Sequence, residues 1–488
     1  MVLEKEKEEE KKGLKEIPGG YGWWPWWSAI RDRLDFFWFQ GETQFWVSRM
    51  EKYKSTIFRC NVPPSPPGFP TNPVVMLLDL KSFPILFDVS KVEKKNVLLA
   101  NYMPSLKFYG GIRPCIYLDP SEDRHERIKS FVIDLIKLNA SKWVPEMEAA
   151  CAEAFPVWEE DLKKKGRAQV NHETGQIACN VLIKTILGRD PRAEGEYSLK
   201  THGPFLFQAW LAPQLSPIAS AGLPHLLEEL LIHTFPIPYF FVSIFYKKLE
   251  KFFETYGQEV IDMAQIKYGL DRHDALHNIL FFMGFNAFGG LNLFFPPMIG
   301  YVGGAGQKLH KDLAEEVREA VRIEGKGKLT ANALNKMELL KSVVYECLRM
   351  YPPVPYQYAV AKEDLIIETH DGRYKVKKGE ILGGCQPMAT RDPKVFKDPD
   401  NFLASRFVGE DGRKLLRHVV WGNGPGDAET STKNKQCAAA NLVPFLSQTL
   451  LACMFLRYDS FTTFKPTIRG NQITVHFSSL NKAAFPLI

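Results

Sequence analysis

A cysteine between a glycine-rich loop and an apolar segment is the residue of this sequence best suited to chemistry. Residues 421–425 read WGNGP, residues 434–437 read NKQC, and the segment after Cys437 is apolar. We expect a helix over about 438–455, whose free N–H groups and positive partial charge lower the pKa of a thiol and donate hydrogen bonds to sulfur. An iron-thiolate centre needs such a ligand. A buried structural cysteine at a helix start is the alternative interpretation.

Two further motifs precede the cysteine. Glu346 and Arg349 stand three residues apart, so they share one helix face and can form an ion pair. Surface helices carry many such pairs, so this one alone indicates little. Arg406, in the segment DPDNFLASRF (398–407), could join them in a buried Glu–Arg–Arg network, because a buried charge requires partners and arginine suits bidentate pairing. The three motifs in this order favour Cys437 as an iron ligand.

Composition and cysteine spacing exclude several other classes of protein. The net charge is +6 over 488 residues, which is too weak and too dispersed for a nucleic-acid-binding stripe. None of the eight cysteines forms a CxxC pair, so a zinc site of the usual spacing is not expected. The hydrophobic share of 45% and the aromatic share of 12% supply a large core and suit a deep apolar pocket.

The N-terminal residues give no sign of a targeting segment. Residues 1–16 are a mixed charge run that we expect to be disordered; they have no apolar core for a signal peptide and too much glutamate for a transit peptide. Four tryptophans follow, Trp23, Trp24, Trp26 and Trp27. They could touch a membrane interface, or form a packed entry segment over the core.

No uninterrupted run of about 20 apolar residues is present. The nearest candidate, 278–302, contains asparagines, glycines and the pair Pro296-Pro297, so we expect a buried helix followed by a break. The sequence therefore predicts no transmembrane anchor. We expect an intracellular protein that is cytoplasmic, plastidial or associated with a membrane surface.

The elements that must position these motifs are mainly helical with minor β structure. We expect one domain over 17–488, β-rich at about 55–118 and 364–386, and helical at about 120–350 and 438–455. Helices are predicted over 122–137, 143–165, 247–265, 275–284 and 308–323. Strands are predicted over 55–60, 74–80, 364–369, 374–377 and 473–477.

The order of these motifs resembles the cytochrome P-450 superfamily, which implies its fold and a haem b with a cysteine thiolate as axial ligand. Monooxygenases of that superfamily carry an acid-alcohol pair in a long central helix, but residues 284–290 (GFNAFGG) hold neither. This segment and NKQC resemble the plant branch that metabolises fatty-acid hydroperoxides: allene oxide synthases, hydroperoxide lyases and divinyl ether synthases. Further matching motifs are EIPGGYG from residue 16, YKST at 53–56, YMPS at 102–105 and PPVPYQY at 352–358.

This resemblance implies a specific chemistry. The fatty-acid hydroperoxide brings its own peroxide, so O2, NADPH and a reductase partner are not needed. Homolysis of the O–O bond leads to an epoxyallylic radical, and the fate of that radical separates the three activities. Loss of an electron and a proton gives an allene oxide, hydroxyl rebound gives a hemiacetal that falls apart into a short aldehyde and an oxo-acid, and rearrangement with proton loss gives a divinyl ether.

Site residues follow from the resemblance one at a time. Asn286 matches the family's asparagine over the haem, whose amide can hydrogen-bond the hydroperoxide. Lys94, His125, Lys129 and Lys435 match haem-contacting positions, and the haem propionates are carboxylates that need cations. His125 and Lys129 stand four residues apart, which places both on one helix face.

One position bears on the reaction type. Where allene oxide synthases carry a phenylalanine that can stabilise the radical, this sequence has Leu98, as in the lyases and divinyl ether synthases. Residues 285–290 and 33–40 (RLDFFWFQ) resemble the subgroup rich in lyases acting on 13-hydroperoxides. The sequence therefore predicts a hydroperoxide lyase. The alternatives are a divinyl ether synthase, then an allene oxide synthase, and, from another class, a reductase-dependent monooxygenase.

The sequence departs from the family's pattern after the cysteine. Ala440-Asn441 stands where a polar pair such as Lys-Asp is usual. Pro444 falls just past the first turn of the helix expected over 438–455, so we expect a local kink there.

Overall fold

The computed structural model describes residues 13–20, 25–61, 73–100, 102–470 and 472–484. Trp23 and Trp24 lie outside the described residues. Trp26 and Trp27 belong to a described helix, but their side chains lie outside the description. Contact of this tryptophan segment with a membrane therefore stays a prediction.

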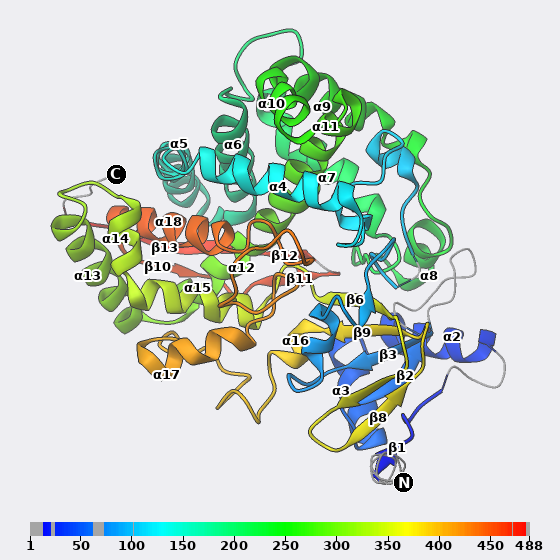
Figure 1. The fold of residues 1–488 in the computed structure, drawn as a ribbon. Coiled ribbons are helices and arrows are strands. Elements are labelled where there is room, and N and C mark those ends of the chain that lie inside the picture. The colour runs from blue at the N-terminus through cyan, green and yellow to red at the C-terminus, as the bar shows by residue number, and fades with distance from the viewer. Residues whose placement is uncertain (1–12, 21–24, 62–72, 101, 471, 485–488) are drawn as a thin grey trace.

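A large helical body makes up most of the molecule, and a smaller β-rich part with the N-terminal helices lies beside it (Figure 1). The predicted class, mainly α with minor β, is confirmed. The helices that precede the long central helix are α2 Pro25–Leu34, α3 Glu42–Tyr53, α4 Asp123–Leu138, α5 Trp143–Lys165, α6 Val170–Leu187, α7 Gly203–Leu211, α8 His225–Glu228, α9 Ser243–Tyr256 and α10 Gln258–Tyr268. The later ones are α13 Gln307–Ile323, α14 Ala331–Lys336, α15 Glu338–Met350, α16 Gln386–Ala389, α17 Gly409–Lys414 and α18 Leu442–Arg457.

The β-rich part contains a five-stranded sheet of order β2-β3-β9-β6-β4. Its strands are β2 Ile57–Asn61, β3 Pro73–Leu77, β9 Ile381–Cys385, β6 Tyr356–Ala361 and β4 Val92–Glu93. Strands β3 and β9 pair in parallel, and the other neighbours pair antiparallel. A compact hydrophobic cluster lies against this sheet, and a larger one fills the helical body.

Smaller sheets complete the fold. The predicted hairpin after residue 364 is present as β7 Leu365–Glu368 and β8 Arg373–Val376. Near the C-terminus, β10 Tyr458–Thr463 pairs with β13 His476–Lys482, which also pairs with β5 Ala168–Gln169, and β11 Thr467–Arg469 pairs with β12 Gln472–Thr474.

Three predictions about element boundaries are wrong. Leu14–Lys15 is not disordered, because this strand, β1, pairs in parallel with β8. The helix predicted over 247–265 is two helices, since α9 ends at Tyr256 and α10 begins at Gln258, with Gly257 between them. The segment 94–118 is not β-rich: short 3-10 turns, Leu106–Tyr109 and Cys115–Tyr117, take the place of strands.

The long central helix continues where we expected a break. It runs without interruption through α11 Arg272–Leu280, a π-helical stretch η9 Phe281–Phe288, and α12 Gly289–Gly304, with Pro296 and Pro297 inside α12. Phe294, Phe295 and Met298 are fully buried around the two prolines. Their packing outweighs the roughly 3 kcal/mol that an interior proline costs a helix. This helix is long and apolar enough to cross a membrane, but two-thirds of its most apolar window is buried in the protein, as in a core helix.

The helix after Cys437 begins later than predicted. Residues 438–441 form a turn, and α18 begins at Leu442. Pro444 is therefore the third residue of the helix, where a backbone N–H has no partner within the helix. The predicted kink at Pro444 is wrong for that reason: the proline ends up in the first turn, which tolerates it.

Candidate active site

The loop before Cys437 is closed by backbone hydrogen bonds. The N–H of Cys437 donates to the carbonyl of Gly422 at 2.8 Å, and the N–H of Ala440 donates to the carbonyl of Cys437 at 3.0 Å. The buried side chain of Gln436 donates to the carbonyl of Pro425 at 3.2 Å. A Cβ atom on Gly424 would lie 2.9 Å from Cγ of Gln436, so the loop needs glycine at this position. These contacts fix the cysteine between the loop and α18.

The sulfur of Cys437 lies in an environment that suits a metal-bound thiolate. Burial raises the pKa of the Cys437 thiol, while a hydrogen bond from the Ala439 N–H and the charge of Lys129 act in the opposite direction. A buried thiolate therefore needs a cation at the sulfur itself, and an iron ion supplies one. The amide and the lysine would then stabilise the charge that remains on the sulfur.

Four basic side chains that the resemblance assigned to the haem lie near this loop, and three of them are buried. Lys94, His125 and Lys129 are each at most 4% exposed. Nζ of Lys94 donates to Oδ1 of Asn423 at 2.7 Å, and Nζ of Lys129 donates to the carbonyl of Asn434 at 2.5 Å. Both asparagines belong to the loop that leads to the cysteine.

The fourth basic side chain, Lys435, is half-buried, and its ammonium group is held by backbone carbonyls. Its Nζ donates to the carbonyls of Cys115, Ile116 and Leu118 at 2.8, 3.1 and 2.9 Å. These carbonyls belong to and follow the turn that precedes α4, the helix that carries His125 and Lys129. The four basic side chains thus come from three separate segments of the chain.

No carboxylate of the described residues forms an ion pair with these four basic side chains. The nearest ones are engaged elsewhere: Asp119 accepts the backbone N–H of Lys94 at 2.8 Å, and Glu122 pairs with Arg113 at 2.9 Å. Buried positive charges without a buried negative partner are costly, and an anionic ligand removes that cost. The cluster therefore fits the two propionate groups of a haem.

The pKa values of these basic side chains are lowered, as expected where no anion lies beside them. Burial, and then the charge of Lys435, lower the pKa of Lys94 to about 7. Burial is the first cause that lowers the pKa of Lys129 to about 8. Burial and then the charges of Lys435 and Lys129 lower the pKa of His125 to about 3, and its Nδ1 has no hydrogen-bond partner.

A stripe of accessible residues runs along the otherwise buried central helix. Asn286 and Leu293 are exposed and Gly290 is half-exposed, whereas Gly284 and Phe288 are buried. The spacings of four and three residues place the stripe on one face. A Cβ atom on Gly290 would meet no atom within 4 Å, so the space beside Gly290 on this face is open. The same helix packs against α18, which follows the cysteine (Figure 1).

Leu98 occupies a tight turn beside this helical body. It is half-buried and packs against both hydrophobic clusters. Leu99 and Tyr102 exchange backbone hydrogen bonds of 3.3 and 2.9 Å, and Ala100 adopts φ +52° between them. Burial raises the pKa of Tyr102 to about 12, so its hydroxyl stays neutral. The turn therefore presents an aliphatic side chain, not an aromatic ring, at position 98.

The structure brings Glu346, Arg349 and Arg406 together. Arg349 donates to Glu346 at 2.7 and 2.8 Å, and Nε of Arg406 lies 3.0 and 2.9 Å from the same two oxygens. Both side chains of the helical pair are fully buried. Arg349 also donates to the carbonyls of Thr390 and Pro399 at 2.9 and 2.7 Å. The network thus ties α15 to the segment that leads toward the cysteine loop.

Two residues of the site were missed by sequence reasoning. Asn423 and Asn434 receive the ammonium groups of Lys94 and Lys129. The available signal was their position beside the glycines of WGNGP and at the start of NKQC. Their partners lie about 300 residues away, which a local pattern does not reveal.

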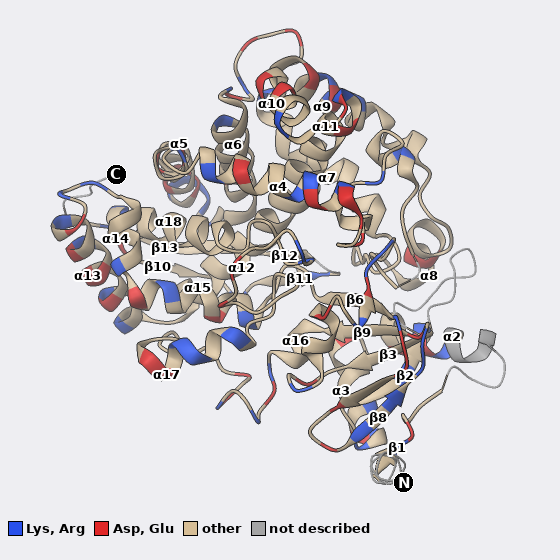
Figure 2. Ribbon diagram, viewed as in Figure 1, with Lys and Arg blue, Asp and Glu red and all other residues tan. Residues whose placement is uncertain are grey.

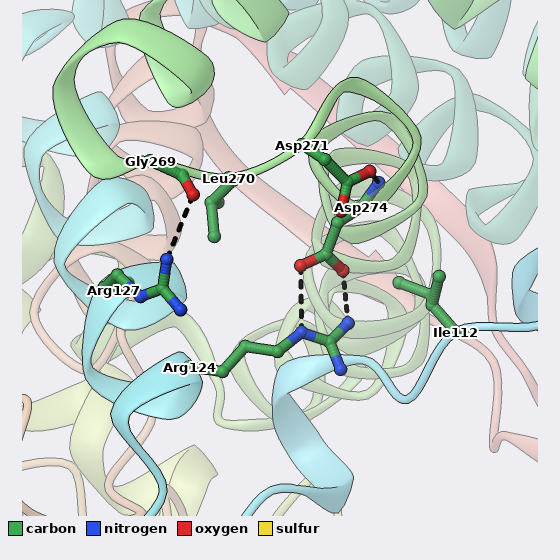
Figure 3. A pocket seen from close by; sticks show the side chains of 7 residues that line it. All are labelled: Ile112, Arg124, Arg127, Gly269, Leu270, Asp271 and Asp274. Atoms are coloured by element: carbon green, nitrogen blue, oxygen red, sulfur yellow. Dashed lines mark hydrogen bonds and ion pairs between the residues drawn. The ribbon is translucent and has the colours of Figure 1, made fainter.

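A separate recess of about 360 Å³ lies between α4 and the start of α11 (Figure 3). Nε of Arg124 donates to Asp274 at 2.8 Å, and Arg127 donates to the carbonyl of Gly269 at 3.0 Å. Arg124 pairs with Asp274 inside the recess, Arg127 pairs with Asp123 of its own helix, and the recess contains none of the predicted site residues. We assign it no part in the chemistry.

The chain is similar to a known protein family and to several characterised proteins. The model of the cytochrome P-450 family matches residues 306–425. A divinyl ether synthase of Selaginella moellendorffii is 43% identical over 96% of this chain and 96% of its own length. A chloroplastic allene oxide synthase of Arabidopsis thaliana is 45% identical over 97% and 90%. A chloroplastic fatty acid hydroperoxide lyase of Solanum lycopersicum is 42% identical over 92% and 94%.

Proposed function

This chain belongs to the cytochrome P-450 family, in the branch of its divinyl ether synthase, allene oxide synthase and hydroperoxide lyase relatives, and on that premise we propose that it converts fatty-acid hydroperoxides. The family implies a haem with a cysteine thiolate ligand. We assign that ligand to Cys437. The substrate carries its own oxidant, so the reaction needs neither O2 nor a reductase.

The observation that carries this proposal is the accessible face of the central helix. Asn286 is the only side chain of residues 284–290 with hydrogen-bonding groups, and it lies on that face. An amide both donates and accepts, so it can hold a hydroperoxide group in place. Residues 284–290 contain no acid or alcohol that could deliver protons to bound oxygen. The bound haem supplies the iron that opens the O–O bond of the substrate.

The remaining site residues hold the cofactor and shape the pocket. Lys94, Lys129 and Lys435 would pair with the propionates and His125 would hydrogen-bond them; the support is that these side chains are buried or half-buried without carboxylate partners. We assign Leu98 to the lining of the substrate pocket, where it would offer no ring to a radical intermediate.

For the product, we propose cleavage to a short aldehyde and an oxo-acid, the hydroperoxide lyase reaction. Leu98 supports this choice over an allene oxide synthase. A divinyl ether synthase is the second candidate, because Leu98 also fits that activity and the Selaginella relative of that activity is 43% identical over 96% of this chain. An allene oxide synthase is third, and a reductase-dependent monooxygenase is disfavoured. The chloroplastic relatives support a plastid as the compartment.

The test is product analysis without reductant. The purified holoprotein is incubated with the 9- and 13-hydroperoxides of linoleic and linolenic acid in the absence of NADPH, and products are identified by mass spectrometry. Short aldehydes are expected. Divinyl ethers would select the second candidate and ketols the third. Failure to consume any hydroperoxide would overturn the proposal as a whole.

A further inference from the structure

A second recess, of about 280 Å³, lies on the helical body and shares no residue with the one in Figure 3. Residues of α14, α15 and α17 line it together with Phe407 and Leu416. The three helices lie close together in Figure 1. None of the residues predicted to hold the haem or the substrate lines this recess, so the proposed reaction does not use it.

The inner wall of this recess is apolar. Phe407 and Leu416 are buried beneath it, and the ring of Tyr345 meets Phe407 edge to face with centroids 6.3 Å apart. A water molecule takes about 30 Å³ and a methylene group has a similar size, so the recess holds roughly nine such groups. An aliphatic chain of medium length therefore matches both the surface and the volume of the recess.

Two hydroxyl groups line this recess with unused capacity to donate hydrogen bonds. Tyr345 is only 6% exposed, and its hydroxyl has no hydrogen-bond partner among the described residues. Burial, with a smaller contribution from Asp427, raises the pKa of Tyr345 to about 12, so the hydroxyl keeps its proton at neutral pH. Oγ of Ser342 accepts the N–H of Phe407 at 2.9 Å and can still donate its own proton. A buried polar group without a partner is costly, so the recess favours a ligand that accepts hydrogen bonds.

The rim of the recess is positively charged. Four charged side chains line it, and three of them are basic. Arg413 pairs with Glu338, the one acid of the lining. Lys336 and Lys341 are exposed and form no ion pair with any described residue. Figure 2 shows the charged residues of α17, which borders the recess. The lining therefore has two positive charges in excess, which an anionic group would neutralise.

We propose that this recess binds an aliphatic carboxylate of about ten carbons. The carboxylate would lie between Lys336 and Lys341 and accept a hydrogen bond from the Tyr345 hydroxyl, and the chain would lie against Phe407 and Leu416. An inorganic anion would leave the apolar wall uncovered, and an uncharged chain would leave the two lysines unpaired. This binding site is separate from the haem and does not depend on the proposed reaction.

The experiment is photolabelling of the haem-loaded full-length protein with decanoate that carries a diazirine at the end of its chain. The corresponding alcohol, with the same diazirine, is the uncharged probe. Probe concentrations stay below those that form micelles, and labelled chymotryptic peptides are quantified by mass spectrometry. The test variant is Lys336→Ala/Lys341→Ala, and the matched control is Lys308→Ala/Lys328→Ala, which removes two exposed lysines elsewhere. A third variant, Tyr345→Phe, removes only the hydroxyl. Thermal unfolding of each variant reports folding.

Wild type and control should show saturable labelling of peptides that contain Tyr345 or residues 407–416, about tenfold stronger with the carboxylate than with the alcohol. The double-lysine test variant should lose about tenfold in affinity for the carboxylate, and Tyr345→Phe about threefold. Equal labelling of test and control variants would overturn the proposal, as would equal labelling by the two probes or labelling that does not saturate. Unchanged affinity in Tyr345→Phe would contradict the part assigned to the hydroxyl.

Discussion

Nζ of Lys94 lies 2.7 Å from Oδ1 of Asn423, so a buried ammonium group ends on a neutral amide and not on a carboxylate. The contact joins Lys94, which directly follows β4 at the edge of the five-stranded sheet, to the loop that leads to Cys437. Its positive charge stays uncompensated in the protein alone. Several properties of the site follow from that arrangement.

Haem retention should weaken as pH rises above neutrality. The pKa of Lys94 is lowered to about 7 and that of Lys129 to about 8, chiefly by burial, and a propionate raises both. The contribution of these lysines to haem affinity is therefore fully present below about pH 7 and declines as pH rises through about 8, where binding requires proton uptake. Haem transfer to excess apomyoglobin, measured from about pH 6 to pH 9, should accelerate with pH.

The Lys94→Met variant tests the assignment to the lysine. It should lose haem faster at about pH 6 and show a flatter pH dependence, whereas Lys251→Met, on an exposed ion pair, should behave as wild type. An unchanged slope in Lys94→Met would show that another group titrates.

Removing Arg406 should destabilise the fold strongly. Its Nε lies 2.9 Å from a fully buried Glu346, so Arg406→Leu leaves one arginine fewer on that carboxylate and costs about 3–5 kcal/mol. Arg413→Ala removes an exposed ion pair to Glu338 and should cost less than about 1 kcal/mol. Urea unfolding followed by circular dichroism measures both. Similar losses for the two variants would argue against a structural role of the network.

Acid should destabilise the protein through His277. Burial, and then the charge of His273, lower the pKa of His277 to about 4, and its Nδ1 lies 2.6 Å from the Tyr246 hydroxyl. A lowered pKa means that the folded state favours the neutral form of this histidine. Its contribution to the free energy of unfolding is therefore present above about pH 6.5 and is lost as the pH falls toward 4. The wild type should lose up to about 3 kcal/mol of unfolding free energy over that window.

Replacing the histidine should remove most of this dependence. His277→Gln should be less stable near pH 7.5 but lose less on acidification, while His172→Gln, at an exposed position, should titrate as wild type does. Parallel pH curves for His277→Gln and wild type would contradict the assignment.

Asn286→Gln should lower turnover of hydroperoxide by about tenfold or more while leaving haem content unchanged, because the longer side chain moves the amide on the accessible face. Asn292→Ala is the control on the same helix: Oδ1 of Asn292 faces Gly175 of α6, away from that face. Single-turnover kinetics with haem quantified by the pyridine hemochrome assay separate the two effects. Equal turnover in Asn286→Gln and wild type would remove the amide from the reaction.

The helices with clear periodicity could be predicted from the sequence almost to the residue. The helix over 143–165 has its predicted bounds, and α4 places His125 and Lys129 on one face as expected. Local propensity decided these cases. The Glu346–Arg406 contact could be expected as well, because a buried carboxylate demands partners of a specific type.

Other features depend on tertiary packing and could not be predicted. Pro296 and Pro297 indicated a break, but buried phenylalanines around them keep the helix continuous. The start of α18 shifted to Leu442 because Pro444 is tolerated only in a first turn. Asn423 and Asn434 belong to the site because Lys94 and Lys129, which are far away in the sequence, donate hydrogen bonds to them.

The most direct test of the account is the identity of the iron ligand. In Cys437→Ser, the reduced carbon monoxide complex should lose the red-shifted Soret band typical of thiolate ligation, whereas Cys115→Ser, a half-buried cysteine of the same region, should keep it. Persistence of the thiolate band in Cys437→Ser would contradict the assignment of Cys437 and with it the site described around this loop.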